Sequence, residues 1–351
     1  MEFSENKAAV LHGAMDLRLE NIPTPVVKEN DVLLSIGSVG ICGSDIKYWK
    51  TGACGRFTVE QPMVIGHEAS GTVVKVGSAV TSLRPGDRVA IEPGVPCRKC
   101  RCCKHGRYNL CPDVKFCATP PIDGNLCRLF SHPEDFCFKL PDHVSLDEGA
   151  MLEPLAVAVY SCHRADVTSG SNILICGAGP VGILCMMVAR SAGASVVVMT
   201  DIDDHRLERA KSLGADHVIK VQTRDPEELA NQVEDILGTK PDSTFECCGT
   251  DFSMAAGIYA THPGGSVIIV GRGSALPQLP INLAAMREID IKGIMRYANC
   301  YPTALSLVAT GAVDVKPLIT HHFSLDETVK AFQTAVTPES QAVKVMIHCD
   351  Q

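Results

Sequence analysis

The chain contains 351 residues, 46% of them hydrophobic and 21% charged, and its formal net charge is -8 at pH 7. This length allows two domains and a large core. The acidic balance, without a basic run, argues against a nucleic acid or an anionic membrane surface as a partner.

The first ten residues are polar and charged and lack the apolar segment of a secretory signal. No apolar run is long enough to span a membrane. In a long chain of this kind, an odd count of 17 cysteines favours free thiols and metal ligands over disulfides. We therefore expect a soluble, cytoplasmic protein.

The N-terminal part is predicted to be rich in short strands separated by turn residues, at 7–11, 16–20, 31–39, 72–76 and 88–92. Residues 40–45 interrupt this pattern as a predicted loop. Its glycines, Gly40 and Gly43, lie on either side of Cys42 and would let that thiol approach the backbone and a ligand.

Four cysteines in one short stretch have metal-ligand spacing: Cys97, Cys100, Cys103 and Cys111. Their thiolates can complete a tetrahedron around Zn²⁺, which predicts a structural site with no open position. Cys102 is interpreted as a bystander, and His105 is an alternative ligand. Four unligated thiols are the alternative to zinc.

A capping box formed by Ser145 and Glu148 predicts the start of a helix. The chain then reaches Glu153, which has apolar residues before it and Pro154 after it. A carboxylate in that setting is costly to bury without a partner. A metal ion, a bound hydroxyl and a buried salt bridge are all open as that partner.

Residues 171–201 have the pattern of a dinucleotide-binding βαβ unit. A short apolar strand is followed at once by Gly177-x-Gly179-x-x-Gly182, then by a helical segment and a second strand that ends at Asp201. The glycines permit a tight turn and a close approach to a pyrophosphate. The helix N-terminus supplies N–H donors for the phosphates.

Asp201 is expected to select the cofactor. A carboxylate at this point can accept hydrogen bonds from both ribose hydroxyls and would repel a 2′-phosphate. Asp203 and Asp204 add to this repulsion. Arg206 could receive a 2′-phosphate, but behind three acids we expect it to lie along the adenosine. The sequence therefore favours NAD over NADP.

Further strands are predicted at 217–219, 243–247, 266–270 and 290–294, alternating with helical segments. With the first two they give six strands, the number in a doubly wound Rossmann sheet. The tail is predicted to hold helices at 303–309 and 324–335 and a last strand at 342–347. It is too short for a domain and is expected to return to the N-terminal one.

Cys42, His67, Glu68 and Glu153 are candidates for a second metal site, but they are far apart in sequence. Taken singly, each has an ordinary explanation as a packed thiol, a core histidine, a strand-edge charge or a buried salt bridge. Spacing alone does not establish a shared metal.

Several motifs together resemble the zinc-dependent medium-chain dehydrogenase/reductase family: Gly40-Ile-Cys42-Gly-Ser-Asp45, Gly66-His67-Glu68-Ala-Ser-Gly71, the four-cysteine stretch and the fingerprint at Gly177. Within it the polyol (sorbitol) dehydrogenases are most similar, through Arg18-Leu-Glu-Asn21, Cys117-Ala-Thr119-Pro-Pro, Asp123-Gly-Asn-Leu-Cys127-Arg128, Asp290-Ile-Lys-Gly293 and Arg296-Tyr297. The resemblance covers nearly the whole chain. One departure is the four-cysteine set, which animal members of this subgroup often lack.

The resemblance implies an α/β fold in which a Rossmann domain, residues 156–294, is inserted into a β-rich GroES-like catalytic domain. Residues 1–155 and 295–351 would form that catalytic domain. It also implies one catalytic and one structural zinc per chain, NAD as cofactor, and a homotetramer.

The resemblance further implies a catalytic zinc held by Cys42, His67 and Glu68 plus water. Glu153 lines the site, with direct ligation left open. Asp45 is expected to fix the tautomer of His67, and Ser44 to carry a proton outward. Expected substrate contacts are Tyr48, Phe116, Thr119, Glu153, Arg296 and Tyr297. Expected cofactor contacts are Gly177, Gly179, Val181, Gly182, Asp201, Arg206, Val270, Gly271, Arg272, Ile294 and Arg296.

The expected activity is zinc-dependent oxidation of a secondary alcohol of a polyol, such as sorbitol or xylitol, with hydride transfer to NAD⁺. One alternative is an NADP(H)-dependent ketose reductase, which Asp201 disfavours. Another is an alcohol or threonine dehydrogenase on the same scaffold, which Glu153 and Arg296 disfavour. A non-catalytic nucleotide-binding relative is a third, although no zinc ligand is missing.

Overall fold

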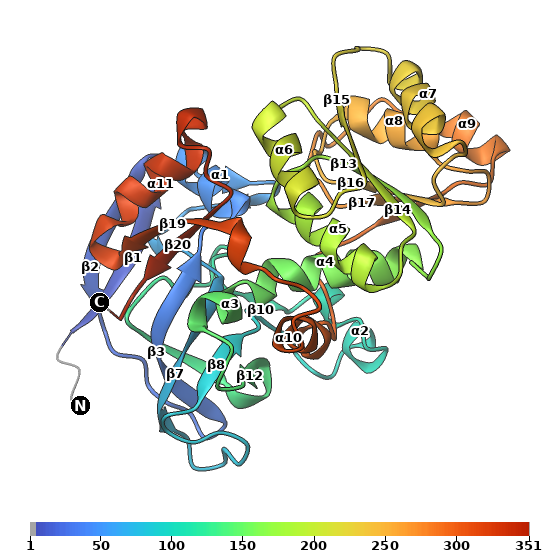
Figure 1. The fold of residues 1–351 in the computed structure, drawn as a ribbon. Coiled ribbons are helices and arrows are strands. Elements are labelled where there is room, and N and C mark those ends of the chain that lie inside the picture. Colours follow the sequence, from blue (N-terminus) through green and yellow to red (C-terminus); the bar gives the residue numbers. More distant parts are fainter. Residues whose placement is uncertain (1–4, 351) are drawn as a thin grey trace. The chain divides into compact units, whose positions relative to one another are not determined.

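A computed structural model describes residues 5–350 and divides into two compact units (Figure 1). The chain builds the first unit up to Glu153, forms the second over Pro154–Cys300, and returns to the first at Tyr301. The expected domain boundaries lay after residue 155 and before residue 295. The chain thus leaves the first unit two residues earlier than expected and re-enters it six residues later.

The first unit is built around a seven-stranded sheet of order β12-β8-β7-β3-β20-β19, in which β11 also pairs with β3. A smaller sheet has the order β2-β1-β6. The strands of these two sheets are β1 (Asn6–Gly13), β2 (Asp16–Ile22), β3 (Asp31–Gly40), β6 (Met63–Val64), β7 (Glu68–Val76), β8 (Arg88–Ile91), β11 (Leu129–Pro133), β12 (Cys137–Lys139), β19 (Ile319–Ser324) and β20 (Lys344–His348).

The remaining elements of this unit are short. Two short antiparallel pairs are β4 (Ala53–Cys54) with β5 (Phe57–Thr58) and β9 (Gly94–Val95) with β10 (Lys115–Phe116). The helices are α1 (Gly43–Thr51), α2 (Arg101–Lys104), α3 (Leu146–Ala150), α10 (Tyr301–Ala309) and α11 (Thr328–Val336). Single 3₁₀ turns lie at Tyr108–Leu110, Glu134–Phe136, Lys316–Leu318, Leu325–Glu327 and Pro338–Ser340.

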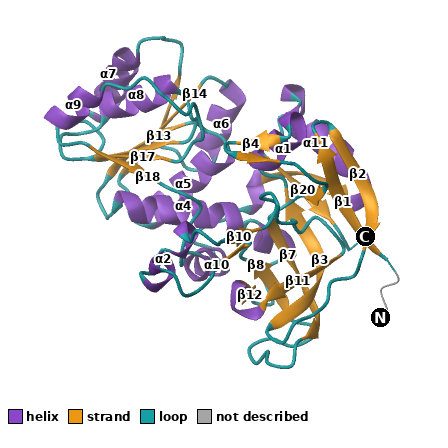
Figure 2. Cartoon of the chain, turned by 180° about the vertical axis from the view of Figure 1, so that it is seen from behind, coloured by secondary structure: helices purple, strands orange, loops and turns teal. Residues whose placement is uncertain are grey.

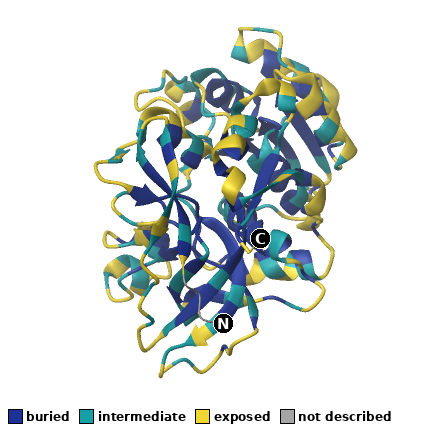
Figure 3. Ribbon diagram, turned by 90° about the vertical axis from the view of Figure 1, so that its left-hand side faces the viewer, coloured by how far each residue is buried: buried dark blue, intermediate teal, exposed yellow. Residues whose placement is uncertain are grey.

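Burial explains why β3 lies in the middle of its sheet. Eight of its ten residues are buried, so both faces of the strand are covered, and its sequence reads as a nearly continuous apolar run. On one side of this core the ring of Trp49 from α1 meets Phe332 from α11 edge to face, with centroids 5.7 Å apart. Figure 3 shows the strands largely buried and the loops exposed.

The C-terminal segment completes the first unit, as expected. Strand β20 pairs antiparallel with β3, with Met346 opposite Gly40 and His348 opposite Ser38. Strand β19 then pairs in parallel with β20. At the start of α10 the buried Tyr301 hydroxyl donates a hydrogen bond of 2.7 Å to the carbonyl of Ile91 at the end of β8.

The second unit contains a six-stranded parallel sheet of order β15-β14-β13-β16-β17-β18, the order of a doubly wound Rossmann sheet. Its strands are β13 (Asn172–Cys176), β14 (Val196–Asp201), β15 (His217–Lys220), β16 (Ser243–Glu246), β17 (Ser266–Ile269) and β18 (Asp290–Gly293). The predicted number of strands and fold class are confirmed.

Helices cover both faces of this sheet (Figure 2). They are α4 (Leu152–Ala165), which begins in the first unit, α5 (Pro180–Ser191), α6 (Asp204–Ser212), α7 (Pro226–Leu237), α8 (Asp251–Ala260) and α9 (Ile281–Met286). Helices α7 and α8 pack on the face that carries Leu174, whereas α5 contacts the neighbouring Ile175. Because side chains alternate along a strand, α5 lies on the opposite face.

Two sequence predictions need correction, and one strand was missed. Residues 43–45 are not loop but the first turn of α1, with Cys42 just before it. Strand β19 was not predicted, because Ile319–Ser324 contains two histidines and little apolar alternation. The helix predicted from residue 324 begins at Thr328, after a 3₁₀ turn.

Within residues 5–350, no helix is long and apolar enough to cross a membrane.

Candidate active site

Three potential metal ligands from two separate segments meet in the first unit. Cys42 precedes α1, His67 follows β6, and Glu68 begins β7, and their ligand atoms lie within 4.8 Å of one another. His67 and Glu68 are almost fully buried, and Cys42 is half-buried. A thiolate, an imidazole and a carboxylate suit Zn²⁺ better than Mg²⁺ or Ca²⁺, which prefer oxygen ligands.

Asp45 holds the two segments that carry these ligands. One of its carboxylate oxygens accepts a hydrogen bond of 3.0 Å from the Cys42 backbone N–H, and the other accepts one of 3.4 Å from the Gly66 N–H. Its Oδ1 also lies 3.3 Å from Nδ1 of His67, although the alignment is not that of a hydrogen bond. The carboxylate thus faces Nδ1 of His67 without the expected hydrogen bond that would fix the tautomer of the ring.

The local charges favour a cation. Burial lowers the pKa of His67, but the Asp45 carboxylate and the Cys42 thiol raise it, and the net direction is well above the ordinary value. The ring of Phe116 lies 5.7 Å from the His67 ring and covers it from one side. The donor set and its surroundings therefore fit a zinc ion.

A buried lysine completes the site. Lys344 Nζ, from β20, donates to both carboxylate oxygens of Glu68 at 2.6 and 2.8 Å and to the Ile41 carbonyl at 3.1 Å. The ion pair approaches the backbone so closely that a Cβ atom at Gly40 would collide with the Glu68 carboxylate. Glycine is therefore required at residue 40 for this pairing.

Sequence reasoning missed Lys344, although a signal was present. It is a lysine at the start of an apolar strand, and a buried lysine requires a partner. The sequence does not indicate which acid that partner is, since Glu68 and Lys344 are 276 residues apart.

The other predicted residues of this site are distributed over both units. Glu153 is buried, but it is not among the described ligand atoms that meet within 4.8 Å. Ser44 and Tyr48 lie on α1, and Phe116 and Thr119 lie on and just after β10. Arg296 and Tyr297 follow β18 in the second unit, and Arg296 has a positive φ of 53°.

The four predicted zinc ligands Cys97, Cys100, Cys103 and Cys111 lie around α2, in a segment that we call the four-cysteine lobe. Their sulfurs have the spacing of a metal tetrahedron. The sulfur of Cys103 lies 3.4 Å from that of Cys100 and 4.0 Å from that of Cys97. Zinc–sulfur bonds of about 2.3 Å place neighbouring sulfurs about 3.8 Å apart in a tetrahedron, so four thiolates here fit zinc. Cys111 is the fourth member of the group, and Cys102 lies outside it.

Backbone donors prepare this lobe for a cation. The N–H groups of Lys99 and Cys100 lower the pKa of the Cys97 thiol to about 7. A thiolate, not a thiol, is the metal ligand. Arg98 is tied by a bidentate ion pair to Asp135, at 2.7 Å, which anchors the lobe to the 3₁₀ turn before β12.

Glu92 connects the lobe to the sheet. It follows β8, it is 2% exposed, and it accepts a 2.6 Å hydrogen bond from the hydroxyl of Tyr108 in the lobe. Burial raises the pKa of Glu92 to about 7; Tyr108 opposes this rise, and Glu153 and Asp135 add to it.

In the second unit the glycine turn lies between β13 and α5. Gly177 has a φ of 105°, a conformation that L-residues rarely adopt, and Gly179 is the N-cap of α5 with Pro180 following it. A Cβ at Gly182 would collide with the Gly177 carbonyl. The turn and the unsubstituted helix start fit the phosphates of a dinucleotide.

Asp201 is the last residue of β14, and its carboxylate fixes the glycine turn through a hydrogen bond. Its Oδ2 accepts a 2.8 Å hydrogen bond from the Ala178 N–H, and its Oδ1 accepts from the N–H groups of Ile202 and Asp203. Arg206 lies 4.0 Å from it and is largely exposed. The sequence predicted a carboxylate for the ribose but not that it also fixes the glycine turn.

The remaining expected cofactor contacts follow other strands. Val270, Gly271 and Arg272 come directly after β17, and Ile294 comes after β18. Gly271 packs against Gly249, which follows β16. These segments are at the carboxyl ends of parallel strands, where ligands bind in open α/β sheets.

Comparison with known proteins agrees with these features. Residues 28–142 match the family described as the alcohol dehydrogenase GroES-like domain, and residues 180–310 match the family of zinc-binding dehydrogenases.

Two curated relatives match almost the whole chain. The sorbitol dehydrogenase of Mus musculus is 54% identical over 346 residues, which span 99% of this chain and 96% of the mouse protein. That of Homo sapiens is 52% identical over 345 residues, spanning 98% and 96%. Among solved structures, L-idonate 5-dehydrogenase of Escherichia coli has a TM-score of 0.91 at 29% identity and covers 98% of both chains.

The raised pKa of Glu92 predicts a pH-dependent stability. The folded-state pKa of about 7 lies above the ordinary value of 4.5. Glu92 therefore makes its full contribution to the free energy of unfolding below pH 4.5, and this contribution is lost as the pH rises to 7. Glu92→Gln should therefore gain stability relative to wild type between pH 5 and 8, on the order of 3 kcal/mol. Melting temperatures across this pH range measure the gain.

The matched control is Glu134→Gln. Hydrogen bonds from Ser82 lower the pKa of that exposed carboxyl, so it stays ionised in both states over the same range. The difference in melting temperature between Glu134→Gln and wild type should not change with pH above 5. A parallel pH response of the two variants would contradict the assignment to Glu92.

The ion pair of Lys344 with Glu68 predicts a large loss of stability on truncation. The two side chains are 5% and 2% exposed. Lys344→Met leaves an uncompensated buried carboxylate and should cost about 3–5 kcal/mol, seen as a fall in melting temperature of about 10 °C.

Lys330→Met is the control for this variant. Its ion pair with Glu327 has side chains that are 66% and 44% exposed. Its removal should cost less than about 1 kcal/mol. Equal losses in the two variants would show that the buried pair does not stabilise the fold.

Proposed function

Because the chain belongs to the zinc-dependent medium-chain dehydrogenase/reductase family, we propose that it oxidises a secondary alcohol of a polyol, such as sorbitol or xylitol, to the ketose. Hydride passes to NAD⁺. The observation that carries this proposal is identity above 50% over nearly the full length to the sorbitol dehydrogenases of mouse and human.

The first unit provides the metal chemistry. Cys42, His67 and Glu68 hold zinc, which when bound supplies a Lewis acid that lowers the pKa of an alcohol oxygen. Asp45 positions Cys42 and the segment before His67 through its backbone hydrogen bonds. Lys344 neutralises the carboxylate of Glu68 from the side of β20.

Two further residues of the first unit handle water and the proton. Glu153, buried next to the apolar start of α4, orients a water molecule or substrate hydroxyl through its carboxylate. Ser44, half-buried in the first turn of α1, carries the released proton outward. The other substrate contacts are assigned to Tyr48, Phe116, Thr119, Arg296 and Tyr297. Arg296 supplies several donors for chain hydroxyls.

The second unit binds and orients the cofactor. The turn from Gly177 to Gly182 cradles the pyrophosphate, and Asp201 receives the adenosine ribose. Asp201 is already fixed by three backbone N–H groups, so its negative charge stays in place to repel a 2′-phosphate. This charge favours NAD⁺ over NADP⁺ as the cofactor that accepts the hydride.

The assembly and compartment are also part of the proposal. All 17 cysteines lie in the described part of the chain and none forms a disulfide there, as suits a reducing compartment such as the cytoplasm. We assign a homotetramer on the basis of family membership, and light scattering of the purified protein measures it directly.

An initial-rate panel tests the activity. Sorbitol and xylitol should be oxidised with NAD⁺ at rates at least about tenfold above those for threonine and ethanol, because the substrate contacts are specific to a polyhydroxylated chain. Chelation should abolish the activity, and added Zn²⁺ should restore it. Faster turnover of threonine or ethanol, or full activity after chelation, would contradict the proposal.

The cofactor choice is tested by Asp201→Asn. Loss of the charge removes the repulsion of a 2′-phosphate and weakens a charge-assisted hydrogen bond, so NAD⁺ binding should weaken about tenfold or more and the NADP⁺/NAD⁺ preference should shift toward NADP⁺. Asp225→Asn, at the N-cap of α7, is the control and should change neither value, since both residues cap well. An unchanged cofactor ratio in Asp201→Asn would refute the role of its charge.

A further inference from the structure

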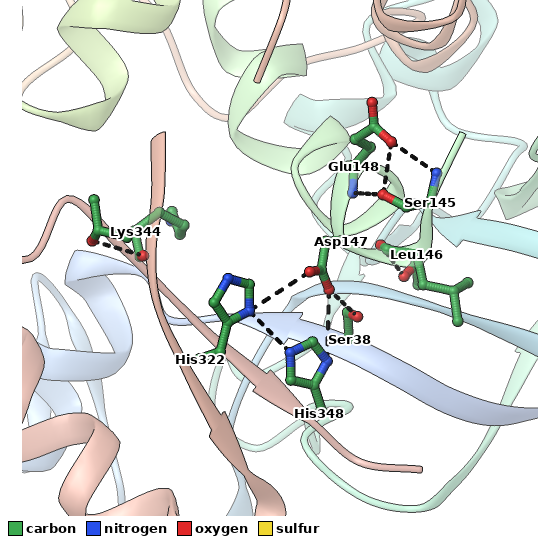
Figure 4. Close-up of polar contacts among 10 residues, drawn as sticks. Ser38, Ser145, Leu146, Asp147, Glu148, His322, Lys344 and His348 are labelled. Carbon is green, nitrogen blue, oxygen red and sulfur yellow. Dashed lines mark hydrogen bonds and ion pairs between the residues drawn. The ribbon is translucent and has the colours of Figure 1, made fainter. Parts of the chain in front are cut away.

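A second group of ligand-type side chains lies in the first unit, apart from the candidate zinc centre and the four-cysteine lobe. Asp147 of α3, His322 of β19 and His348 of β20 bring their ligand atoms within 4.8 Å of one another (Figure 4). They are 25%, 51% and 20% exposed, so the group is open to solvent. Nothing in the proposed dehydrogenase reaction uses these residues.

The two histidines are presented by neighbouring strands. His322 lies opposite Met346, and His348 is two residues further along β20, so both imidazoles project from the same face. Their rings are nearly coplanar and meet edge to edge, with centroids 5.3 Å apart and an interplanar angle of 5°. His322 Nδ1 and His348 Nε2 are 3.0 Å apart.

Asp147 faces both rings. One of its oxygens lies 3.7 Å from His322 Nδ1, and the other lies 3.6 Å from His348 Nδ1. The buried hydroxyl of Ser38 donates a 2.5 Å hydrogen bond to Asp147 Oδ1 and so fixes the carboxylate. A carboxylate can thus serve as ligand with one oxygen while the other orients the second histidine, an arrangement usual at metal sites.

The donor types indicate the class of ion. Imidazole and carboxylate ligands that water completes suit Cu²⁺ and Ni²⁺, which prefer square-planar or octahedral geometry. His322 Nδ1 and His348 Nε2 face each other across a hydrogen bond of 3.0 Å, so the rings must rotate for an ion to replace this bond. Water can supply the remaining ligands at this open face.

We propose that Asp147, His322 and His348 form a third metal site, which binds Cu²⁺ or Ni²⁺, with Ser38 as a positioning residue. The bound ion connects α3 to the last two strands of the sheet. The same elements also position residues of the candidate zinc centre. Helix α3 shortly precedes Glu153 in the chain, and β20 carries Lys344. Binding at this site therefore stabilises the return of the C-terminal segment.

Titration of the zinc-loaded protein with Ni²⁺ tests the proposal, with heat of binding and melting temperature as readouts. Wild type should bind one Ni²⁺ per chain and melt at a higher temperature when Ni²⁺ is present. His322→Ala and His348→Ala should each weaken binding by about 100-fold or more, and Ser38→Ala by about tenfold. The zinc content, measured after titration, should be unchanged in all of them.

His321→Ala is the matched control. It is the neighbouring histidine on β19, its Nδ1 contacts Thr320, and it is not part of the group. It should bind Ni²⁺ as wild type does. Cu²⁺ provides a second test, since its electron paramagnetic resonance spectrum should report two imidazole nitrogens in wild type and one in each histidine variant. Equal Ni²⁺ affinity in wild type and His322→Ala, or release of zinc in proportion to Ni²⁺ bound, would overturn the proposal.

Discussion

The buried ion pair between Glu68 and Lys344 is the contact on which the first unit depends. It joins the beginning of β7 to the beginning of β20, and the Gly40 backbone between them must lack a side chain. A lysine and a glutamate are buried here only because each satisfies the other and the Ile41 carbonyl takes a further donor hydrogen. The C-terminal segment therefore cannot be separated from the metal site, because it carries the counter-charge of a proposed zinc ligand.

The two zinc-ligand groups are built in different ways. The four cysteines lie within one short stretch, and backbone N–H groups of the same stretch lower the pKa of Cys97. Local chain geometry suffices to assemble them, which suits a closed structural site. Cys42 and the adjacent pair His67 and Glu68 come from two segments that only the sheet and the carboxylate of Asp45 bring together. With three protein ligands, the proposed zinc ion keeps a fourth coordination position open for water or substrate, as a catalytic ion requires. The fold of the whole unit determines where that position lies.

Asp201 has a structural role beside the role in cofactor choice that we propose for it. Its carboxylate is fixed by N–H groups on each side of the strand end, and it therefore holds the glycine turn as well as a fixed negative charge. The side chain that we propose to select the cofactor is thus the one that fixes the turn. The sequence motif predicted a carboxylate at the end of this strand. The hydrogen bonds that the carboxylate accepts from Ala178 and Asp203 depend on how the turn closes on β14.

The sequence by itself determined the doubly wound sheet, the four-cysteine lobe and the capping box at Ser145, because each depends on residues close together in the chain and on their periodicity. Its motifs also led to the family. The tertiary structure alone decided that Lys344 pairs with Glu68, that Asp45 holds two ligand segments, and that Asp147 meets His322 and His348. These contacts join residues far apart in the sequence. These long-range contacts depend on the register in which the strands pair, and no local sequence pattern predicts that register.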